Sequence, residues 1–466
     1  MVARDPLRDA AALVRAIVTG RATRGAYTVR RLTDPIRLFL HTEAGGGVVL
    51  LLAALLAIAW ANSPWDHQYF ELLERRVAVT TPWFDIDEDL HHWVNDGLMA
   101  IFFFVVGLEI KRELVHGELA SPSRAALPAV AALGGLVLPA LIFTAFVGGG
   151  PGSEGWGIPM ATDIAFAVGV LALLGNRISL GLKVFLLALA IVDDLGAIAV
   201  IAVFYTDDLA VGWLLGGVGC IAVILIAQRA GIRNVNAYVI MGVALWIALL
   251  QSGVHATLAG VALGLLTPAY SYYSRDRYLA TITQLGERYE TAVRDGLHAL
   301  ASSILLQIEA VSRDTESPLE RLEHAIHPWS SYLVIPVFAF ANAGLVITTD
   351  SISDALESSV THGIVAGLLL GKFVGVMAAA WLAVRLGLTS LPRSVTWLHI
   401  AGVAMLAGIG FTVALFVTGL AYDDPTLVDE ARAGVFIASI VAGVAGFLFL
   451  RFVVPDPKST PDSEAG

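Results

Sequence analysis

Long runs of apolar residues, separated by shorter polar segments, recur from about residue 45 to residue 453. A helix of about 20 mostly apolar residues can cross the hydrocarbon core of a bilayer. We therefore predict an all-α polytopic membrane protein. Its twelve transmembrane helices are expected at about 45–61, 97–109, 126–148, 157–175, 181–205, 209–228, 235–250, 253–267, 329–347, 362–387, 397–421 and 432–453.

The composition supports this prediction. Hydrophobic residues make up 57% of the chain and charged residues only 15%, compared with about 25% charged residues in typical soluble domains. Hydropathy therefore excludes a soluble enzyme, and we expect no enzymatic activity and no cofactor. The chain shows no phosphate-binding loop and no metal-binding cluster of Cys and His. Cys220 is the only cysteine and cannot form an internal disulfide.

The charge of the loops alternates along the chain. Lys and Arg favour the cytoplasmic side in short loops, and here they occupy every second loop, whereas the loops between are almost free of them. This predicts that both termini are cytoplasmic. The expected organisation is an Arg-rich tail at 1–40, a twelve-helix domain at 41–455 and a polar tail at 456–466.

A polar insert at 270–325 interrupts the series of spans. Its apolar residues recur at steps of three and four, with Leu300 filling one missed turn, which predicts an amphipathic helix on the cytoplasmic side. This helix could lie on the membrane surface, pack on a partner helix or be a solvated linker. The residues of this apolar face are Ile282, Leu285, Tyr289, Val293, Leu297, Ile304, Ile308 and Val311.

Two adjacent carboxylates, Asp193 and Asp194, lie in the middle of the apolar stretch 185–205. At ~1.5 Å rise per residue Asp193 is roughly 12 Å from Phe185, near the bilayer midplane. One carboxylate there costs about 2.5 kcal/mol or more, and both stay ionised only with a cation, a proton or a basic side chain. The alternative is a helix end that leaves the pair in a loop. An adjacent pair suits a hard cation, which prefers oxygen ligands.

Two more ionisable residues fall inside predicted spans. Asp163 follows Pro159 and adjoins Thr162, so the helix is expected to break there, and Lys372 lies within 362–387. The sequence GIGFT at 408–412 is a second flexible point. Three aspartates and one lysine can neutralise one another. The alternative for Asp163 and Lys372 is a purely structural role, in which a static ion pair and, in addition, a protonated carboxylate hold the helix bundle together.

Charged residues also stand at span ends. Glu109, Lys111, Arg112 and Glu113 end the second span, either as an anchored helix end or as a charged funnel leading to the site. His255 begins the eighth span, where a packing or capping role is expected.

Seven segments, spread over about 40–455, resemble the bacterial NhaA sodium/proton antiporters. They are NDGLMAIFFFVVGLEIKREL (95–114), GWGIPMATDIAFAVGVLALLG (155–175), FLLALAIVDDLGAIAVIAVFYT (185–206), SGVHATLAG (252–260), HPWSSYLVIPVFAFANAG (327–344), GLLLGK (367–372) and GIGFTVALF (408–416). The chain departs from the family in its long insert and in Phe373, which stands where many relatives have proline.

The resemblance implies a fold with two inverted-topology three-helix repeats, in which spans four and eleven are interrupted and cross at mid-membrane. It implies that Asp194 and Asp193 bind the ion and that Lys372 pairs with Asp193. Asp163, with Thr162, would lie at the helix crossing and offset exposed helix N-termini. By the same resemblance, the acidic residues of a pH-sensing funnel would be Glu109 and Glu113.

The expected function is exchange of cytoplasmic Na⁺ or Li⁺ for external protons across the bacterial cytoplasmic membrane. The exchange is expected to be electrogenic and more active at alkaline pH, and to serve sodium and pH homeostasis. The expected partners are Na⁺, Li⁺, H⁺ and the lipid bilayer, with a homodimer as an open alternative and no nucleic acid. Two other classes are a retinal-based light-driven pump, which a colourless protein would exclude, and a sodium-coupled solute symporter, which sodium-driven solute uptake would support.

Overall fold

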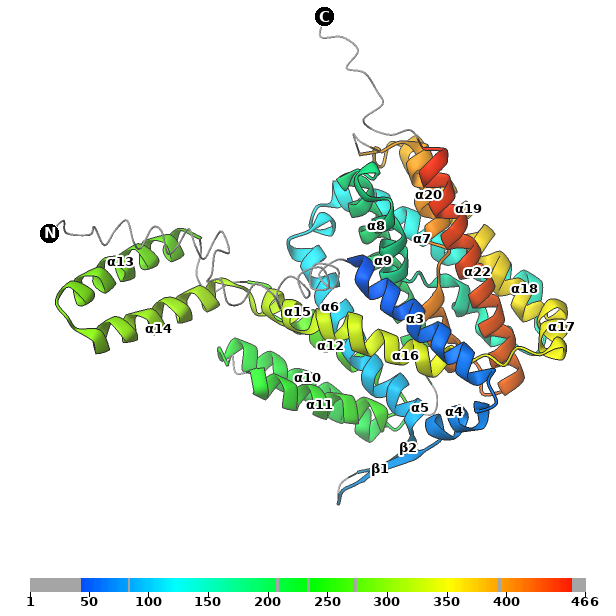
Figure 1. The fold of residues 1–466 in the computed structure, drawn as a ribbon, viewed down its shortest axis with the longest axis horizontal. Coiled ribbons are helices and arrows are strands. Elements are labelled where there is room, and N and C mark those ends of the chain that lie inside the picture. The colour runs from blue at the N-terminus through cyan, green and yellow to red at the C-terminus, as the bar shows by residue number, and fades with distance from the viewer. Residues whose placement is uncertain are drawn as a thin grey trace, which may run out of the picture.

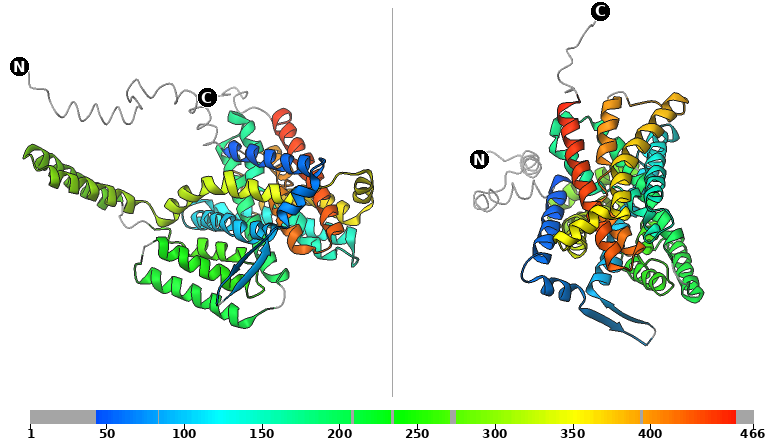
Figure 2. Two further views of the ribbon diagram at one scale, coloured as in Figure 1. Left: turned by 60° about the horizontal axis from the view of Figure 1, so that its bottom comes forward. Right: turned by 90° about the vertical axis from the view of Figure 1, so that its right-hand side faces the viewer.

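The computed structural model describes residues 43–454, apart from residue 83 and the segments 207–208, 233–234, 271–274 and 393–394. Both predicted tails therefore lie outside the described residues. The described chain is mostly helical, and Figure 1 shows most of the helices packed into one body, from which the helical segment 275–315 projects. The all-α prediction is confirmed there, with one addition that the sequence pattern did not predict. Strands β1 (Arg76–Thr80) and β2 (Asp85–Asp89) form an antiparallel hairpin, which projects beyond the helices in Figure 2.

Several helices have the length and apolarity of a membrane span. Among the described residues there are six of them, or up to eight if each of two bent helix pairs counts as one span. A multi-pass membrane protein is therefore confirmed. The six are α7 (Pro122–Val147), the segment Ser153–Leu173 that contains η3 (Ser153–Met160) and α8 (Ile164–Leu173), α9 (Leu180–Phe204), α10 (Val211–Arg229), the segment Ser359–Arg385 and α22 (Pro425–Phe452).

The remaining predicted spans coincide with shorter or bent helices. The two bent pairs are α3 (Glu43–Ala61) with α4 (Asp66–Leu73), and α20 (Trp397–Leu406) with α21 (Phe411–Ala421). His255, which precedes α12, hydrogen-bonds through its ring to the carbonyl oxygen of Tyr205, the C-cap residue of α9. This contact agrees with the expected packing or capping role. The other helices are α5 (Leu90–His92), η1 (Trp93–Leu98), α6 (Met99–Val115), η2 (Glu118–Ala120), η4 (Gly175–Arg177), α11 (Val235–Leu250), α12 (Thr257–Leu266), α16 (Ile335–Asn342) and α17 (Thr349–Glu357).

The segment Ser359–Arg385 is one helical rod with a local irregularity. It consists of α18 (Ser359–Ala366), the π-helical turn η6 (Gly367–Gly371) and α19 (Lys372–Arg385). Such π turns within α-helices are frequent at functional sites, and Lys372 follows this one directly.

Small residues let α19 pack closely on α7. A Cβ atom added to Gly134 of α7 would lie 2.2 Å from the carbonyl oxygen of Gly375, and one added to Gly375 would lie 2.2 Å from that of Gly134. Only glycine permits this approach of two backbones, as in many membrane helix pairs. Since α7 also packs on α9, the contact holds α19 close to the helix that carries the two adjacent aspartates.

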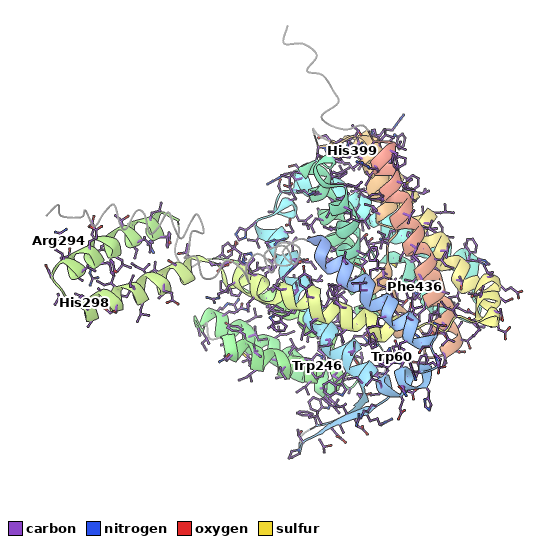
Figure 3. The ribbon with its side chains drawn as sticks, in the orientation of Figure 1. Trp60, Trp246, Arg294, His298, His399 and Phe436 are labelled. Atoms are coloured by element: carbon purple, nitrogen blue, oxygen red, sulfur yellow. The ribbon has the colours of Figure 1, made fainter. Side chains whose placement is uncertain are left out.

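The insert between α12 and α16 corrects one prediction. We expected one amphipathic helix, but the chain forms α13 (Arg275–Arg294) and α14 (His298–Thr315), joined by a turn at Gly296, whose φ is +72°. The apolar residues Leu285, Ala292, Ala301 and Ile304 contact one another between the two helices, because folding back lets each helix cover the other's apolar face. Figure 3 labels Arg294 and His298 at the far end of this hairpin. The chain then continues through α15 (Pro318–Trp329) and η5 (Ser330–Val334) into α16.

Candidate functional site

Asp193 and Asp194 lie in the middle of α9, which continues without a break from Leu180 to Phe204. The alternative of a helix end at the pair is therefore wrong. The Asp193 side chain is 0% exposed and Asp194 is 3% exposed. Adjacent residues on a helix point about 100° apart, so the two carboxylates face different neighbours.

Lys372 reaches Asp193 from α19. Its Nζ lies 2.7 Å from Asp193 Oδ2, and both side chains are fully buried. Moving two opposite charges out of water costs desolvation free energy, which their attraction offsets only when the two groups are in close contact. Lys372 and Asp193 are in such contact, so removal of either charge would leave the other buried without its counter-charge.

The interruption between η3 and α8 brings a hydroxyl to the same carboxylate. Residues 161–163 leave the helix, and Thr162 Oγ1 lies 2.7 Å from Asp193 Oδ2 and 2.9 Å from the carbonyl oxygen of Ala407. Asp193 Oδ1 and Asp194 Oδ1 are buried and have no hydrogen-bond partner among the described residues. Buried polar atoms are normally satisfied, so these two oxygens are open to a proton or a cation.

Asp163 joins the breaks of two helices. Its backbone N–H donates to the carbonyl oxygen of Ile409, at 2.7 Å, in the break between α20 and α21. Its Oδ1 accepts from the Phe166 N–H at 2.8 Å, and its Oδ2 accepts from the N–H of Thr412 at 3.0 Å and from its hydroxyl at 2.7 Å. One carboxylate thus caps the N-terminal turns of α8 and α21, where negative charge is favoured.

Thr412 was not among the site residues predicted from sequence, although it belongs to the GIGFT segment. The sequence indicated a flexible point at this segment of a predicted span. It did not indicate that Thr412 contacts Asp163, because the two residues are 249 positions apart along the chain.

Glu109 and Glu113 lie on α6 in a separate cluster, which we term the α6–α15 cluster and define as Glu109, Arg112, Glu113, Glu323 and His327. Arg112 Nη2 lies 3.6 Å from Glu113 Oε1, and the Arg112 guanidinium also forms an ion pair with Glu323 of α15. Glu109 Oε1 lies 4.0 Å from His327 Nε2, and Glu113 Oε2 accepts from the Glu118 N–H at 3.0 Å. Sequence reasoning missed Glu323 and His327, which lie at the end of the insert and in the next helix turn.

Comparison with known proteins identifies the family. Residues 37–450 match the family model described as Na⁺/H⁺ antiporter 1. The chain is 46% identical over 427 residues to Na⁺/H⁺ antiporter NhaA 2 of Syntrophotalea carbinolica, covering 91% of this chain and 98% of that protein. It is also 46% identical over 430 residues to Na⁺/H⁺ antiporter NhaA of Oleidesulfovibrio alaskensis, covering 91% and 95%. The chain therefore belongs to the NhaA-type Na⁺/H⁺ antiporter family.

Proposed function

We propose that the protein is a secondary antiporter of the bacterial cytoplasmic membrane that extrudes cytoplasmic Na⁺ or Li⁺ in exchange for external protons, for sodium and pH homeostasis. The names of the relatives, Na⁺/H⁺ antiporter, support the exchange of these two ions. The proposed topology has twelve spans, two inverted three-helix repeats and cytoplasmic termini. Large apolar side chains such as Leu52, Leu215 and Ile440 are 60%, 66% and 65% exposed, which supports contact of the helices with lipid.

The observation that carries the proposal is the pair of buried adjacent carboxylates, of which Asp193 Oδ1 and Asp194 Oδ1 have no hydrogen-bond partner within the described segments. Na⁺ is a hard cation, and hard cations prefer oxygen ligands. Asp194 and Asp193 offer carboxylate oxygens, and the Thr162 hydroxyl lies within hydrogen-bond distance of Asp193. A proton and Na⁺ can satisfy the same carboxylate oxygens but not at the same time, and that exclusivity is what an exchanger requires.

The transport cycle follows from this competition. At alkaline cytoplasmic pH the pair loses its proton and takes up a dehydrated Na⁺. The loaded site then turns outward by movement of one helix bundle against the other, as in related transporter folds. Outside, protons displace Na⁺, and the protonated site returns. Exchange should therefore be more active at alkaline pH.

Lys372 connects ion binding to charge movement. Na⁺ that binds Asp193 must compete with the Lys372 ammonium, whose Nζ lies 2.7 Å from the same carboxylate. If Lys372 gives up its proton when the ion binds, or if both aspartates titrate, more than one proton moves per Na⁺. The cycle then carries net charge and is driven by the membrane potential, at about 2.3 kcal/mol per charge per 100 mV.

The other predicted residues have supporting roles in this proposal. Asp163 offsets the N-terminal ends of α8 and α21, so that the two helix breaks are stable inside the membrane. In the α6–α15 cluster, Glu109 and Glu113 belong to a cytoplasmic funnel that adjusts the response to pH. The contacts of this cluster with α15 support a mechanical connection between the funnel and span nine.

The test is Na⁺-induced dissipation of a pH gradient in everted vesicles, scanned over pH and repeated with Li⁺. The wild-type protein should dissipate the gradient at alkaline pH, and a potential-sensitive dye should respond when Na⁺ is added. Vesicles with Asp354→Asn, an exposed carboxylate on α17, serve as the matched control and should behave like the wild type. No Na⁺ or Li⁺ response at any pH would refute the proposal.

A further inference from the structure

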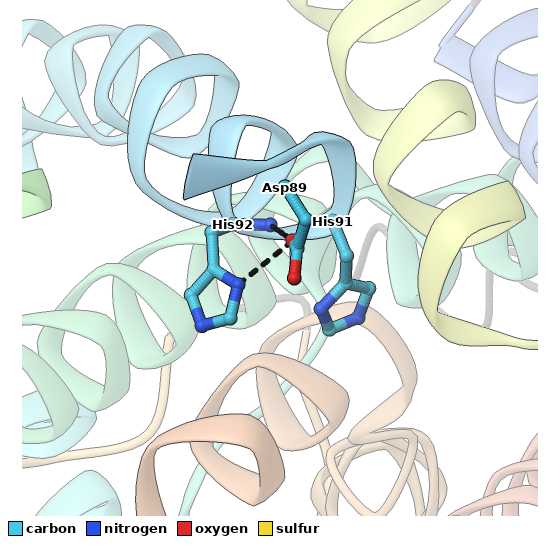
Figure 4. Close-up of side chains that lie close together, drawn as sticks. All are labelled: Asp89, His91 and His92. Atoms are coloured by element: carbon cyan, nitrogen blue, oxygen red, sulfur yellow. Dashed lines mark hydrogen bonds and ion pairs between the residues drawn. The ribbon is translucent and has the colours of Figure 1, made fainter. Parts of the chain in front are cut away.

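Asp89, His91 and His92 form a cluster at the end of β2 and the start of the helix that leads into α6. Each offers one ligand atom, and these atoms all lie within 4.8 Å of one another. Figure 4 shows the two imidazole rings flanking the Asp89 carboxylate. None of the three residues belongs to the carboxylate site or to the α6–α15 cluster, so the transport mechanism leaves them unused.

The helix start holds Asp89 and His92 together. Asp89 is the N-cap residue, with extended backbone (φ −75°, ψ 169°). Its Oδ1 accepts the His92 backbone N–H at 2.8 Å and lies 2.8 Å from His92 Nδ1. The capping hydrogen bond therefore orients the carboxylate toward the ring before any ion arrives.

His91 is oriented by a contact with span nine. Its Nε2 lies 3.1 Å from Asn342 Oδ1, and the Asn342 amide group donates to Asn95 Oδ1 at 2.8 Å and to the Phe338 carbonyl at 3.0 Å. Since the amide uses its NH₂ group for these two bonds, Oδ1 is its acceptor and His91 Nε2 is the donor. Nδ1 then carries the lone pair. It is 3.3 Å from the Asn95 amide nitrogen, which would have to yield to a ligand.

The hydrogen bond from the His91 ring to Asn342 is of the kind that orients histidines in metal sites. Histidines that bind metals usually donate their other ring N–H to a carbonyl or carboxylate oxygen, which fixes the tautomer. The Arg432 guanidinium acts electrostatically on His91. Besides Asp89, the carboxylates of Glu88 and Asp96 act electrostatically on His92.

We propose that Asp89, His91 and His92 bind a divalent transition-metal ion of the Zn²⁺ class, through one carboxylate oxygen and one nitrogen of each imidazole. Two imidazoles with one carboxylate suit Zn²⁺, whereas Na⁺ and Mg²⁺ prefer sites made of oxygen atoms. Three protein ligands leave a fourth tetrahedral position for water. Through the His91–Asn342 hydrogen bond, the ion would brace the start of span two against span nine.

The test is Zn²⁺ binding to the purified full-length protein in detergent, after removal of any His-tag and treatment with a chelator, measured by equilibrium dialysis with radioactive Zn²⁺. The wild-type protein should bind a single Zn²⁺ per chain that excess Mg²⁺ does not displace. His91→Ala and Asp89→Asn should each weaken Zn²⁺ binding by at least about tenfold. Loss of a residue that only orients a metal ligand usually costs that much, and loss of a ligand itself should cost no less. Asp89→Asn is the informative variant if His91→Ala folds poorly, because Asn retains the helix cap.

Two controls separate this site from the rest of the molecule. His67→Ala, at an exposed histidine of α4, should bind Zn²⁺ like the wild type. Asp194→Asn should also bind it like the wild type, because the proposed site is separate from the transport site. The proposal is overturned by a wild-type protein without saturable Zn²⁺ binding, by unchanged affinity in both His91→Ala and Asp89→Asn, or by loss of binding in Asp194→Asn.

Discussion

Two buried carboxylates, Asp163 and Asp194, differ sharply in how they are satisfied. Asp163 is 1% exposed, and its two oxygens accept hydrogen bonds from Phe166 and Thr412. Asp194 is 3% exposed, and its Oδ1 has no hydrogen-bond partner in the described part of the chain. A buried polar group without a partner costs free energy, so Asp194 needs a further partner and Asp163 does not. Burial alone therefore does not distinguish a structural carboxylate from one that exchanges ions.

Asp193 lies between these two cases. One of its oxygens contacts Lys372 and Thr162, whereas the other has no hydrogen-bond partner among the described residues. We expect replacements at Asp193 and Asp194 to affect transport, replacements at Asp163 to affect mainly stability, and replacements at Lys372 to affect both.

The largest expected effect is on exchange at the carboxylate pair. Asp194→Asn and Asp193→Asn should each reduce Na⁺/H⁺ exchange in everted vesicles to background, because Asn keeps the shape but loses the charge that binds Na⁺ and the group that carries the proton. Membrane content, measured by quantitative immunoblotting, should match that of Asp354→Asn. Near-normal exchange in both variants would show that the pair is not the ion site.

Removal of the lysine should have the largest effect on stability. Lys372→Ala should lower the melting temperature at alkaline pH more than Lys372→Arg does, because breaking a buried ion pair typically costs about 3–5 kcal/mol. At acid pH the loss should be smaller, because Asp193 can then remain protonated. The measurement is thermal unfolding in detergent at both pH values. Equal melting temperatures for the wild-type and Ala proteins at alkaline pH would contradict a stabilising contribution of the Lys372–Asp193 ion pair.

Replacement at Asp163 should have a smaller effect on stability and a partial effect on exchange. In Asp163→Asn the new NH₂ group meets the Thr412 N–H or the Phe166 N–H, so one buried donor loses its acceptor. That should cost about 1–3 kcal/mol in the free energy of unfolding. The same assays apply. Complete loss of exchange with unchanged stability would place Asp163 among the groups that contact the ion and would remove its contrast with Asp194.

The smallest expected effect concerns pH regulation by the α6–α15 cluster. Protons and Na⁺ compete at the carboxylate pair, so apparent Na⁺ affinity should strengthen as pH rises, about tenfold per pH unit for each proton that must leave. Saturating Na⁺ should then restore most of the exchange lost at acid pH. Neither Glu109 nor Glu113 belongs to the carboxylate pair at which protons and Na⁺ compete, so Glu109→Gln and Glu113→Gln should shift the profile less than tenfold.

The measurement is exchange rate against Na⁺ concentration at several pH values. Competition requires a change in the half-saturating Na⁺ concentration with little change in the maximal rate. A maximal rate that collapses at acid pH and is restored by Glu109→Gln would instead make the cluster a true switch.

Much of the architecture could be predicted from local sequence. The apolar runs, the break before Asp163 and the burial of Asp193, Asp194 and Lys372 all follow from residues within one helix, because a bilayer imposes its cost on each residue according to its own polarity. Twelve spans and inverted repeats remain predictions, since the helices establish six to eight spans in the described residues.

Tertiary structure alone decided which of these residues meet. Asp193 is 179 residues from Lys372, and Asp163 is 249 residues from Thr412, so no local pattern contains either contact. Close packing at Gly134 and Gly375 brings the first pair together, and the contact between two helix breaks brings the second together. The fold of the insert was decided in the same way, because the apolar face of α13 packs on the apolar face of α14. Polarity is a property of single residues, whereas a contact depends on the path of the whole chain. For that reason the sequence by itself determined which groups are buried, and only the fold determined which of the buried groups have hydrogen-bond or ion-pair partners.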